Sequence, residues 1–244
     1  MSTSSYNTPP DTNVRRPYGA AKGFYDPLWL IPRVLTKLYT VWVRTTYPFA
    51  SLGQKVSIHY TCDLQNPALI RIGNFVTVQK DVWLHAQLPQ FERTDPALTI
   101  EDNCFIGRRC HISARNCIHI EKNVMLSASA FIGDNDHNYS DISMPIRDQG
   151  MTEGGRIRIG QGTWIGQNAV ILCDKGELTI GHNCVVAANA VVTRSAPAYS
   201  VLSGNPARIV KHYDPVVGAW MLGARSSVER DVPPLAVAGR GECV

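Results

Sequence analysis

The sequence predicts an all-β solenoid, in which short parallel strands wind into stacked coils, from about residue 56 to residue 197. Three regularities predict it: an aliphatic residue recurs every six positions, a small or medium residue often follows four positions later, and three hexads end in a short interruption. Each hexad then forms one strand and one turn, and three hexads close a triangular coil with inward aliphatic side chains. The aliphatic positions are Ile72, Val78, Leu84, Ile100, Ile106, Ile112, Ile120, Leu126, Ile132, Ile159, Ile165, Ile171, Ile180, Val186 and Val192.

Small residues and glycines complete the pattern of the hexads. We expect the small residues to face inward, which explains Cys62, Cys104, Cys110 and Cys184 as packing residues rather than nucleophiles. We expect the glycines at corners, where unusual backbone angles are needed. Five to six coils, spaced by about 4.8 Å, would form a prism roughly 25 to 30 Å tall. The small positions are Val76, Val82, Cys104, Cys110, Val124, Ala130, Thr163, Ala169, Cys184 and Ala190, and the glycines are Gly73, Gly107, Gly133, Gly160, Gly166 and Gly181.

Length and composition indicate one large domain with appendages. The 244 residues, 44% hydrophobic and 18% charged, describe a globular chain that can bury a core. The net charge of +4 is small and scattered, which argues against the clustered basic face that nucleic-acid binding needs. The seven cysteines form no CxxC pair and no secretory signal opens the chain, so we expect a reduced, cytoplasmic protein.

Two segments precede the repeats. Residues 1–22 are rich in Ser, Thr, Asn and Pro, and we expect a disordered tail because they cannot bury enough apolar surface to offset the entropy of ordering. Residues 23–50 have apolar residues at mixed spacings of three and four, with Arg33, Lys37 and Arg44 roughly on one side. This pattern predicts an amphipathic helix.

The amphipathic helix has two interpretations. In the first it is a cap that covers one open end of the solenoid. In the second, residues 27–47 make peripheral contact with the inner face of a membrane, since Trp29, Tyr39 and Trp42 suit the headgroup boundary. The basic residues interrupt any apolar run long enough to span a bilayer.

The repeat is interrupted between residues 132 and 159, where a loop over 137–156 replaces a tight turn. A long excursion from a compact solenoid is usually functional. His137 stands at its base, and imidazole, with an ordinary pKa of about 6.5, is suited to removing a hydroxyl proton. We expect a neighbouring carbonyl or carboxylate, for which Asp136 and Asp141 are candidates, to hold the second ring nitrogen and so fix the tautomer.

The repeats resemble those of the hexapeptide-repeat acyltransferases, and the ending YSVLSGNPARIVK (199–211) resembles the segment that closes the β-helix in that family. The stretches IGRRCHISARN, SAFIGDNDHNYSD and RIRIGQGTWIGQNAVIL look most like bacterial sugar and polysaccharide O-acetyltransferases. The six-residue period does not determine the hand of the solenoid, and right-handed crossovers are the general rule. The left-handed assignment therefore rests on this resemblance. It implies a left-handed parallel β-helix over residues 51–211, a homotrimer, and metal-free transfer of an acetyl group from the cosubstrate acetyl-CoA to a saccharide hydroxyl.

The resemblance also assigns roles to single residues. It makes His137 the general base, which deprotonates the acceptor without a covalent enzyme intermediate. Arg109 stands where the family has an acceptor-binding asparagine, and an arginine could recognise a carboxylate or phosphate on the sugar. The further acceptor candidates are His85, His111, Asn116 and Asn135, and the positions matched to coenzyme A contacts are Trp164, Gln167, Ala188, Thr193, Arg194, Arg208 and Lys211.

Other functions of a solenoid fit less well. A γ-type carbonic anhydrase has two histidines five residues apart, a spacing that is absent here. Nucleotidyltransferases, serine acetyltransferases and lipid A-type acyltransferases have additional domains that this chain does not resemble. N-acetyl transfer to an amino sugar and a non-catalytic scaffold role stay open, as do the acceptor and the length of the acyl group. The extension over residues 212–244 suggests no role.

Overall fold

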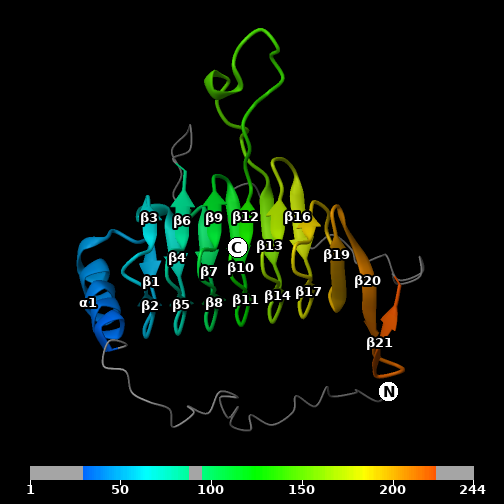
Figure 1. Ribbon diagram of the computed structural model, residues 1–244, viewed down its shortest axis with the longest axis horizontal. Helices are drawn as coiled ribbons and strands as arrows, with labels where there is room; N and C mark the ends of the chain where they lie inside the picture. The colour runs from blue at the N-terminus through cyan, green and yellow to red at the C-terminus, as the bar shows by residue number, and fades with distance from the viewer. Residues whose placement is uncertain (1–29, 88–94, 224–244) are drawn as a thin grey trace, which may run out of the picture.

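The structure, a computed structural model, describes residues 30–87 and 95–223, and it consists of one helix followed by three stacked sheets (Figure 1). The helix is α1 (Leu30–Thr46). The first sheet contains β1 (Ser51–Leu52), β4 (Ile70–Ile72), β7 (Leu98–Ile100), β10 (Cys117–Ile120), β13 (Arg156–Ile159) and β16 (Glu177–Ile180). The second contains β2 (Ser57–Ile58), β5 (Thr77–Val78), β8 (Phe105–Ile106), β11 (Met125–Leu126), β14 (Trp164–Ile165), β17 (Val185–Val186) and β19 (Ser200–Gly204), followed by β20 (Ala207–Asp214) and β21 (Ala219–Leu222). The third contains β3 (Asp63–Gln65), β6 (Trp83–Ala86), β9 (His111–Ala114), β12 (Phe131–Gly133), β15 (Val170–Leu172) and β18 (Val191–Val192).

Successive strands rotate through the three sheets, so that each turn of the chain contributes one strand to each face. The sheets stack as in a left-handed parallel β-helix, which confirms the predicted fold class. Because the first and third sheets have six strands each, the solenoid has six coils, the upper end of the predicted range. After β19 the chain reverses, and β20 and β21 pair antiparallel to their neighbours.

The predicted inward positions form the core. All fifteen aliphatic positions and all ten small positions of the hexads are at most 1% exposed. Aliphatic residues of successive coils are in register, as in the column Ile72, Ile100, Ile120, Ile159 and Ile180. Burying aliphatic surface in this way is the main stabilising contribution to such a fold.

The buried cysteines belong to the same packing. The thiols of Cys62, Cys104, Cys110 and Cys184 each donate to a carbonyl of the next coil, at 3.0 to 3.2 Å. Burial raises the pKa of Cys104 to about 12 and that of Cys62 to about 11. Both thiols are therefore protonated at neutral pH, which agrees with a packing role.

The expectation that the six glycines supply unusual backbone angles is wrong. None of them has a positive φ, and the left-handed turn positions are occupied instead by residues such as Asn103, Asn123 and Asn183. Asparagine tolerates this conformation better than most residues. The glycines are needed for close stacking, because a Cβ on Gly160 would lie 2.5 Å from the backbone nitrogen of His182 in the next coil.

Helix α1 covers the open edge of the first coil. The Thr40 hydroxyl accepts a hydrogen bond from the amide of Ile58 in β2 at 3.1 Å, and Val43 is fully buried. Arg44 donates to the carbonyls of Leu52 and Gly53. An exposed sheet edge is a site for unwanted strand pairing, and this helix blocks it. In the described part of the chain, no helix is long and apolar enough to cross a bilayer.

Candidate active site at the base of the long loop

A loop over residues 134–155 leaves the solenoid after β12 and returns at β13, and it projects well beyond the coils (Figure 1). Apart from the short helical turn Ile146–Asp148, it lacks regular secondary structure. A second long connection joins β6, which ends at Ala86, to β7, which begins at Leu98. Both connections follow a strand of the third sheet, so they begin at the same corner of the triangular prism.

Asp134 anchors the loop to the solenoid. Its carboxylate is fully buried and accepts the backbone amides of Arg115, Asn116 and Cys117 at 2.7 to 2.9 Å. Burial raises the pKa of Asp134, although these amides and the Asn135 side chain act in the opposite direction by stabilising the charged form. The loop therefore starts from a fixed point one coil above the turn at residues 115–117.

A polar network links the first residues of these two connections. The side-chain Nε2 of Gln87 donates to Asn135 Oδ1 at 2.7 Å, and Asn135 Nδ2 donates to the Ser113 carbonyl at 3.0 Å. The Arg115 guanidinium donates to Gln87 Oε1 at 3.1 Å. Asn135, predicted as an acceptor contact, is only 9% exposed, and these bonds fix its side chain.

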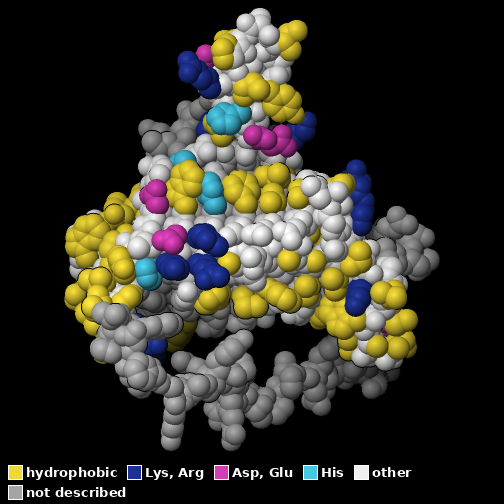
Figure 2. All heavy atoms as spheres, viewed as in Figure 1, with side chains coloured by type: hydrophobic (Ala, Val, Ile, Leu, Met, Phe, Trp, Pro, Cys, Tyr) yellow, Lys and Arg dark blue, Asp and Glu magenta, His cyan; other side chains and the backbone are white. Residues whose placement is uncertain are grey.

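The outer face of the third sheet carries a row of aromatic and imidazole rings below the loop. Figure 2 shows histidine and hydrophobic side chains together on this face. The His111 ring lies 3.8 Å from that of Trp83 and 5.0 Å from that of Phe131, centroid to centroid, and His85 stacks on Trp83 at 5.2 Å. Burial lowers the pKa of both histidines, and the nearby His85 lowers that of His111 further. Both imidazoles are therefore neutral at pH 7.

Two nitrogen atoms in this row lack a partner. Trp83 Nε1 and His111 Nε2 are buried and make no hydrogen bond with the described residues. Such atoms are uncommon in folded proteins, and each one needs an explanation. Together with Ser113 and Asn135, they give this face hydrogen-bonding groups beside flat apolar rings.

His137 lies outside the buried base, in the exposed part of the loop. Its backbone pairs with Met151 across the loop in an antiparallel bridge, and its amide donates to Asp136 Oδ1 at 2.7 Å. Neither candidate partner, Asp136 or Asp141, forms a hydrogen bond with the imidazole among the described residues. Asp136 accepts the backbone amide, and Asp141 accepts the amide and hydroxyl of Ser143. The ring is thus accessible to an acceptor or to a neighbouring chain.

The remaining acceptor candidates lie in different places. The Asn116 side chain donates to the Gly154 carbonyl at 3.1 Å, so it ties the far end of the loop to the coil. Arg109 is exposed at the turn between β8 and β9, on the opposite corner of the third sheet from the loop. The structure therefore places Asn135 at the base of the loop, links His85 to His111 through the ring of Trp83, and leaves Arg109 in the turn before β9.

The donor candidates are exposed but do not form one cluster within the chain. Trp164 begins β14 on the second sheet and donates to Ser127 Oγ at 2.8 Å. Gln167 and Ala188 lie at the corner between the second and third sheets, whereas Thr193 and Arg194 follow β18 on the corner of the loop. Arg208 and Lys211 are both on β20. His137 and Trp164 therefore belong to different faces of the prism.

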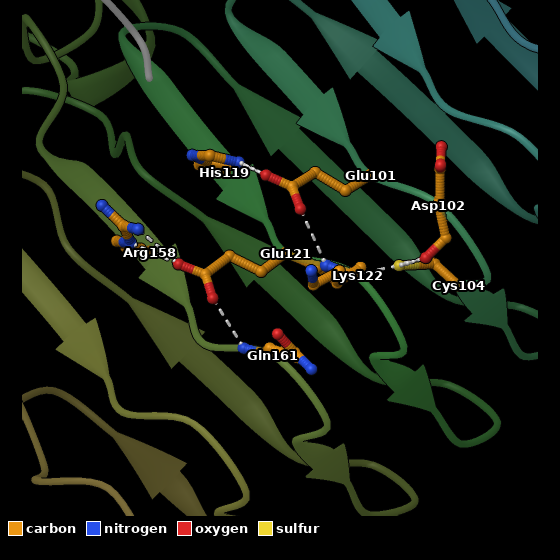
Figure 3. A network of polar contacts seen from close by, with 8 residues as sticks. All are labelled: Glu101, Asp102, Cys104, His119, Glu121, Lys122, Arg158 and Gln161. Atoms are coloured by element: carbon orange, nitrogen blue, oxygen red, sulfur yellow. Dashed lines mark hydrogen bonds and ion pairs between the residues drawn. The ribbon is translucent and has the colours of Figure 1, made fainter. Parts of the chain in front are cut away.

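The first sheet carries a separate polar network that stacks the coils (Figure 3). His119 Nε2 contacts Glu101 at 2.8 Å, while Arg158 and the amide of Gln161 both contact Glu121. Burial alone would raise the pKa of Glu121, but the Gln161 amide and Arg158 hold it below its ordinary value. Because each contact links neighbouring coils, we interpret this network as structural.

Sequence reasoning missed several residues of the loop base. Gln87, Ser113 and Arg115 form its network, and Trp83 and Phe131 form its aromatic row. The alternation in WLHAQ and HISAR was an available signal, because residues two apart in a strand face the same side. Among the described residues, no group of three or more His, Cys, Asp and Glu side chains is arranged to hold a metal ion.

Comparisons with known proteins agree with this fold. A family profile, the hexapeptide repeat of succinyl-transferase, matches residues 97–135 and 156–194. A Mycobacterium tuberculosis protein named as an acetyltransferase is 35% identical over 161 residues, which cover 66% of this chain and 49% of that protein. WbbJ of Escherichia coli, named for O-acetyl transfer in lipopolysaccharide biosynthesis, is 29% identical over 169 residues, covering 67% of this chain and 82% of WbbJ. The chain thus spans about half the length of the first relative.

A solved structure has the same architecture. The crystal structure of AntD, an N-acyltransferase from Bacillus cereus in complex with dTDP and 3-hydroxybutyryl-CoA, matches with a TM-score of 0.59. The match covers 73% of this chain and 91% of AntD at 19% sequence identity. At this identity the likeness shows the fold alone.

Proposed function

The chain belongs to the hexapeptide-repeat acetyltransferase family, and on this premise we propose that it transfers an acetyl group from acetyl-CoA to a hydroxyl of a sugar or polysaccharide precursor. The main support for the proposal is the set of groups on the long loop and on the sheet from which it leaves. The loop carries an accessible imidazole, His137, and it leaves the third sheet, whose outer face carries a row of aromatic and imidazole rings. WbbJ, whose name assigns it to O-acetyl transfer, supports oxygen rather than nitrogen as the attacking atom.

In the proposed reaction His137 accepts the proton of the acceptor hydroxyl while the oxygen attacks the thioester carbonyl. The tetrahedral intermediate then collapses with loss of the coenzyme A thiolate, which takes up a proton. A general base is effective near neutral pH when it is free of a proton, as imidazole largely is. Charge on the intermediate needs a hydrogen-bond donor, and a backbone amide is the simplest source.

The ring face of the third sheet suits a saccharide. Binding sites for small molecules combine flat apolar side chains with a few placed polar groups. Trp83 and Phe131 provide the flat surfaces, and the half-buried His111 ring lies between them. Ser113 and Asn135, held by their own hydrogen bonds, keep the edge of this face rigid.

The donor is assigned to the later coils. Arg194, Arg208 and Lys211 are exposed cations, and guanidinium and ammonium groups bind the phosphates of coenzyme A through charge-assisted hydrogen bonds. Trp164, 45% exposed, offers an apolar surface for the pantetheine arm. Since Trp164, Arg208 and Lys211 belong to the second sheet and His137 to the loop that leaves the third sheet, the proposal requires a neighbouring subunit to complete each site.

The substitution His137→Ala tests the proposed base. Loss of a general base costs about 10² to 10⁴ in rate, so release of free coenzyme A should fall by this factor with every sugar that the wild type accepts. Binding of coenzyme A and the thermal midpoint should not change, because the side chain is exposed. The matched control is Ile142→Ala, which removes a fully exposed side chain from the same loop and should keep full activity.

The same assay of coenzyme A release distinguishes this proposal from another catalytic base, from N-acetyl transfer and from a scaffold role. A rate for His137→Ala within about threefold of wild type would contradict the assignment and make His85 and His111 the next residues to replace. Normal thiol release with amino sugars and none with hydroxyl acceptors would indicate an N-acetyltransferase instead. Failure to release the thiol with any acceptor in the wild type would favour a scaffold role.

A further inference from the structure

The outer side of α1 is a wide apolar surface that no described residue covers. Figure 2 shows hydrophobic side chains gathered at the end of the molecule where α1 lies. Seven large apolar side chains of this one helix are 41% to 62% exposed, which is far more than scattered surface hydrophobics require. They are Leu30, Ile31, Val34, Leu35, Leu38, Val41 and Trp42.

The helix is held firmly, so this surface has a fixed direction. Thr40 bonds to the backbone of β2, Val43 is buried in the core, and Arg44 donates to two carbonyls of the first coil. The contacts lie on one side of the helix, because residues three and four apart share a face. The apolar side chains therefore point away from the solenoid, at the end of the prism.

Charge distinguishes among the possible occupants of this surface. The helix contains Arg33, Lys37 and Arg44 and no acidic residue. Neither Arg33 nor Lys37 forms an ion pair within the described part of the chain. Counted along the sequence, residues 1–46 contain six basic and two acidic residues, which equals the whole net charge of +4. Along the sequence, the excess charge therefore falls in the part of the chain that ends with this helix rather than being scattered, contrary to our expectation from composition.

We propose that α1 is an interfacial helix that docks this protein on an anionic lipid bilayer. A basic helix with leucine, valine and tryptophan on its free face inserts those side chains at the boundary of headgroups and acyl chains. Anionic headgroups attract the flanking lysine and arginine. A second copy of the chain is a poorer occupant, because it would bring two basic rims together with no acidic residue in the helix to pair with them. The proposal is independent of the acyl transfer proposed above.

Co-sedimentation of the full-length protein with vesicles tests the proposal. We expect binding to phosphatidylcholine vesicles containing about 30% phosphatidylglycerol to be at least tenfold tighter than binding to phosphatidylcholine alone. Raising the salt from 0.1 to 0.5 M should weaken it, since screening reduces the attraction. The double substitution Val34→Glu with Leu38→Glu should abolish binding. Absence of binding to both kinds of vesicle would overturn the proposal.

The matched control is Val216→Glu with Val217→Glu, which adds the same charge at exposed apolar positions between β20 and β21, at the other end of the solenoid. This control should bind like the wild type, and equal losses in both double variants would contradict the proposal. The substitutions Arg33→Gln and Lys37→Gln, which leave the apolar face intact, should remove the preference for anionic lipid. A change of molecular mass in Val34→Glu with Leu38→Glu, measured by light scattering, would instead identify α1 as an interface between copies.

Discussion

At the scale of single residues, Asp134 fixes where the loop begins. Its buried carboxylate accepts three consecutive backbone amides from the coil below. An asparagine at this position would direct an NH₂ group at donors that now meet a charge, and hydrogen bonds to charged groups contribute about 1.5 to 3 kcal/mol each.

Asp134→Asn should therefore lower the free energy of unfolding by roughly 2 to 4 kcal/mol, measured by denaturant titration. Asp141→Asn is the control, because the Asp141 carboxylate is exposed and bonds only within the loop. Identical unfolding midpoints for the two variants would mean that the anchor is unimportant.

His111 makes stability depend on pH. Burial and the neighbouring His85 lower its pKa, so the unfolded chain binds a proton more readily than the folded chain. Stability is then complete above the unfolded value of about 6.5 and decreases as pH falls below it. The substitution His111→Phe keeps a ring against Trp83. When the pH is lowered from 7.5 to 5.5, we expect the thermal unfolding midpoint of this variant to decrease by less than that of the wild type. His59 and His85, whose pKa values burial also lowers, are present in both proteins. Equal decreases in the midpoint of the two proteins would show that His111 does not contribute to the pH dependence of stability.

At the scale of strands and turns, the spacing between coils limits side-chain size at the corners. Gly160 has no room for a methyl group, since a Cβ would lie 2.5 Å from the His182 nitrogen and 2.6 Å from the Gly181 carbonyl carbon. The obstacle is backbone of the next coil, which cannot move without opening the sheets between β13 and β16.

Gly160→Ala should lower stability by about 2 kcal/mol or more, in the range for overpacking of a close contact. Gly176→Ala is the comparison, because Gly176 has φ of +71° but no heavy atom near its Cβ position, so only the backbone cost of about 1 to 2 kcal/mol applies. Thermal or denaturant unfolding of both variants gives the comparison. A larger loss of stability for Gly176→Ala would show that the backbone angle, and not the close stacking of coils, is the main reason for glycine at these turns.

At the scale of the whole molecule, the separation of candidate residues predicts an oligomer. His137 projects from one corner, whereas Trp164 lies on the second sheet. A trimer with threefold symmetry would bring such surfaces together at three equivalent grooves. We expect a mass by light scattering of about three times the 26.9 kDa of one chain.

Mixed trimers test the shared site more directly. Co-expressed His137→Ala and Trp164→Ala chains should recover part of the activity that each lacks alone, because some grooves would combine an intact histidine with an intact tryptophan. Activity that is complete in a monomer would contradict the shared groove.

The sequence alone determined the solenoid, its inward residues and the place of the long loop. A six-residue period is a local pattern that every coil repeats, so the side chains of each hexad can be assigned to the core without knowing their partners. His137 could be placed in the long loop for the same reason, because the period stops just before it.

Only the tertiary structure decided how that loop base is built. Its bonds to other coils join residues 17 to 48 positions apart, such as Cys117 to Asp134 and Gln87 to Asn135. Those residues lie beyond the hexads, where two connections of irregular length interrupt the count, so no period assigns them to a rung. The free face of α1 and the close contact at Gly160 likewise depend on what packs beside them, and a single sequence does not state which neighbours are present.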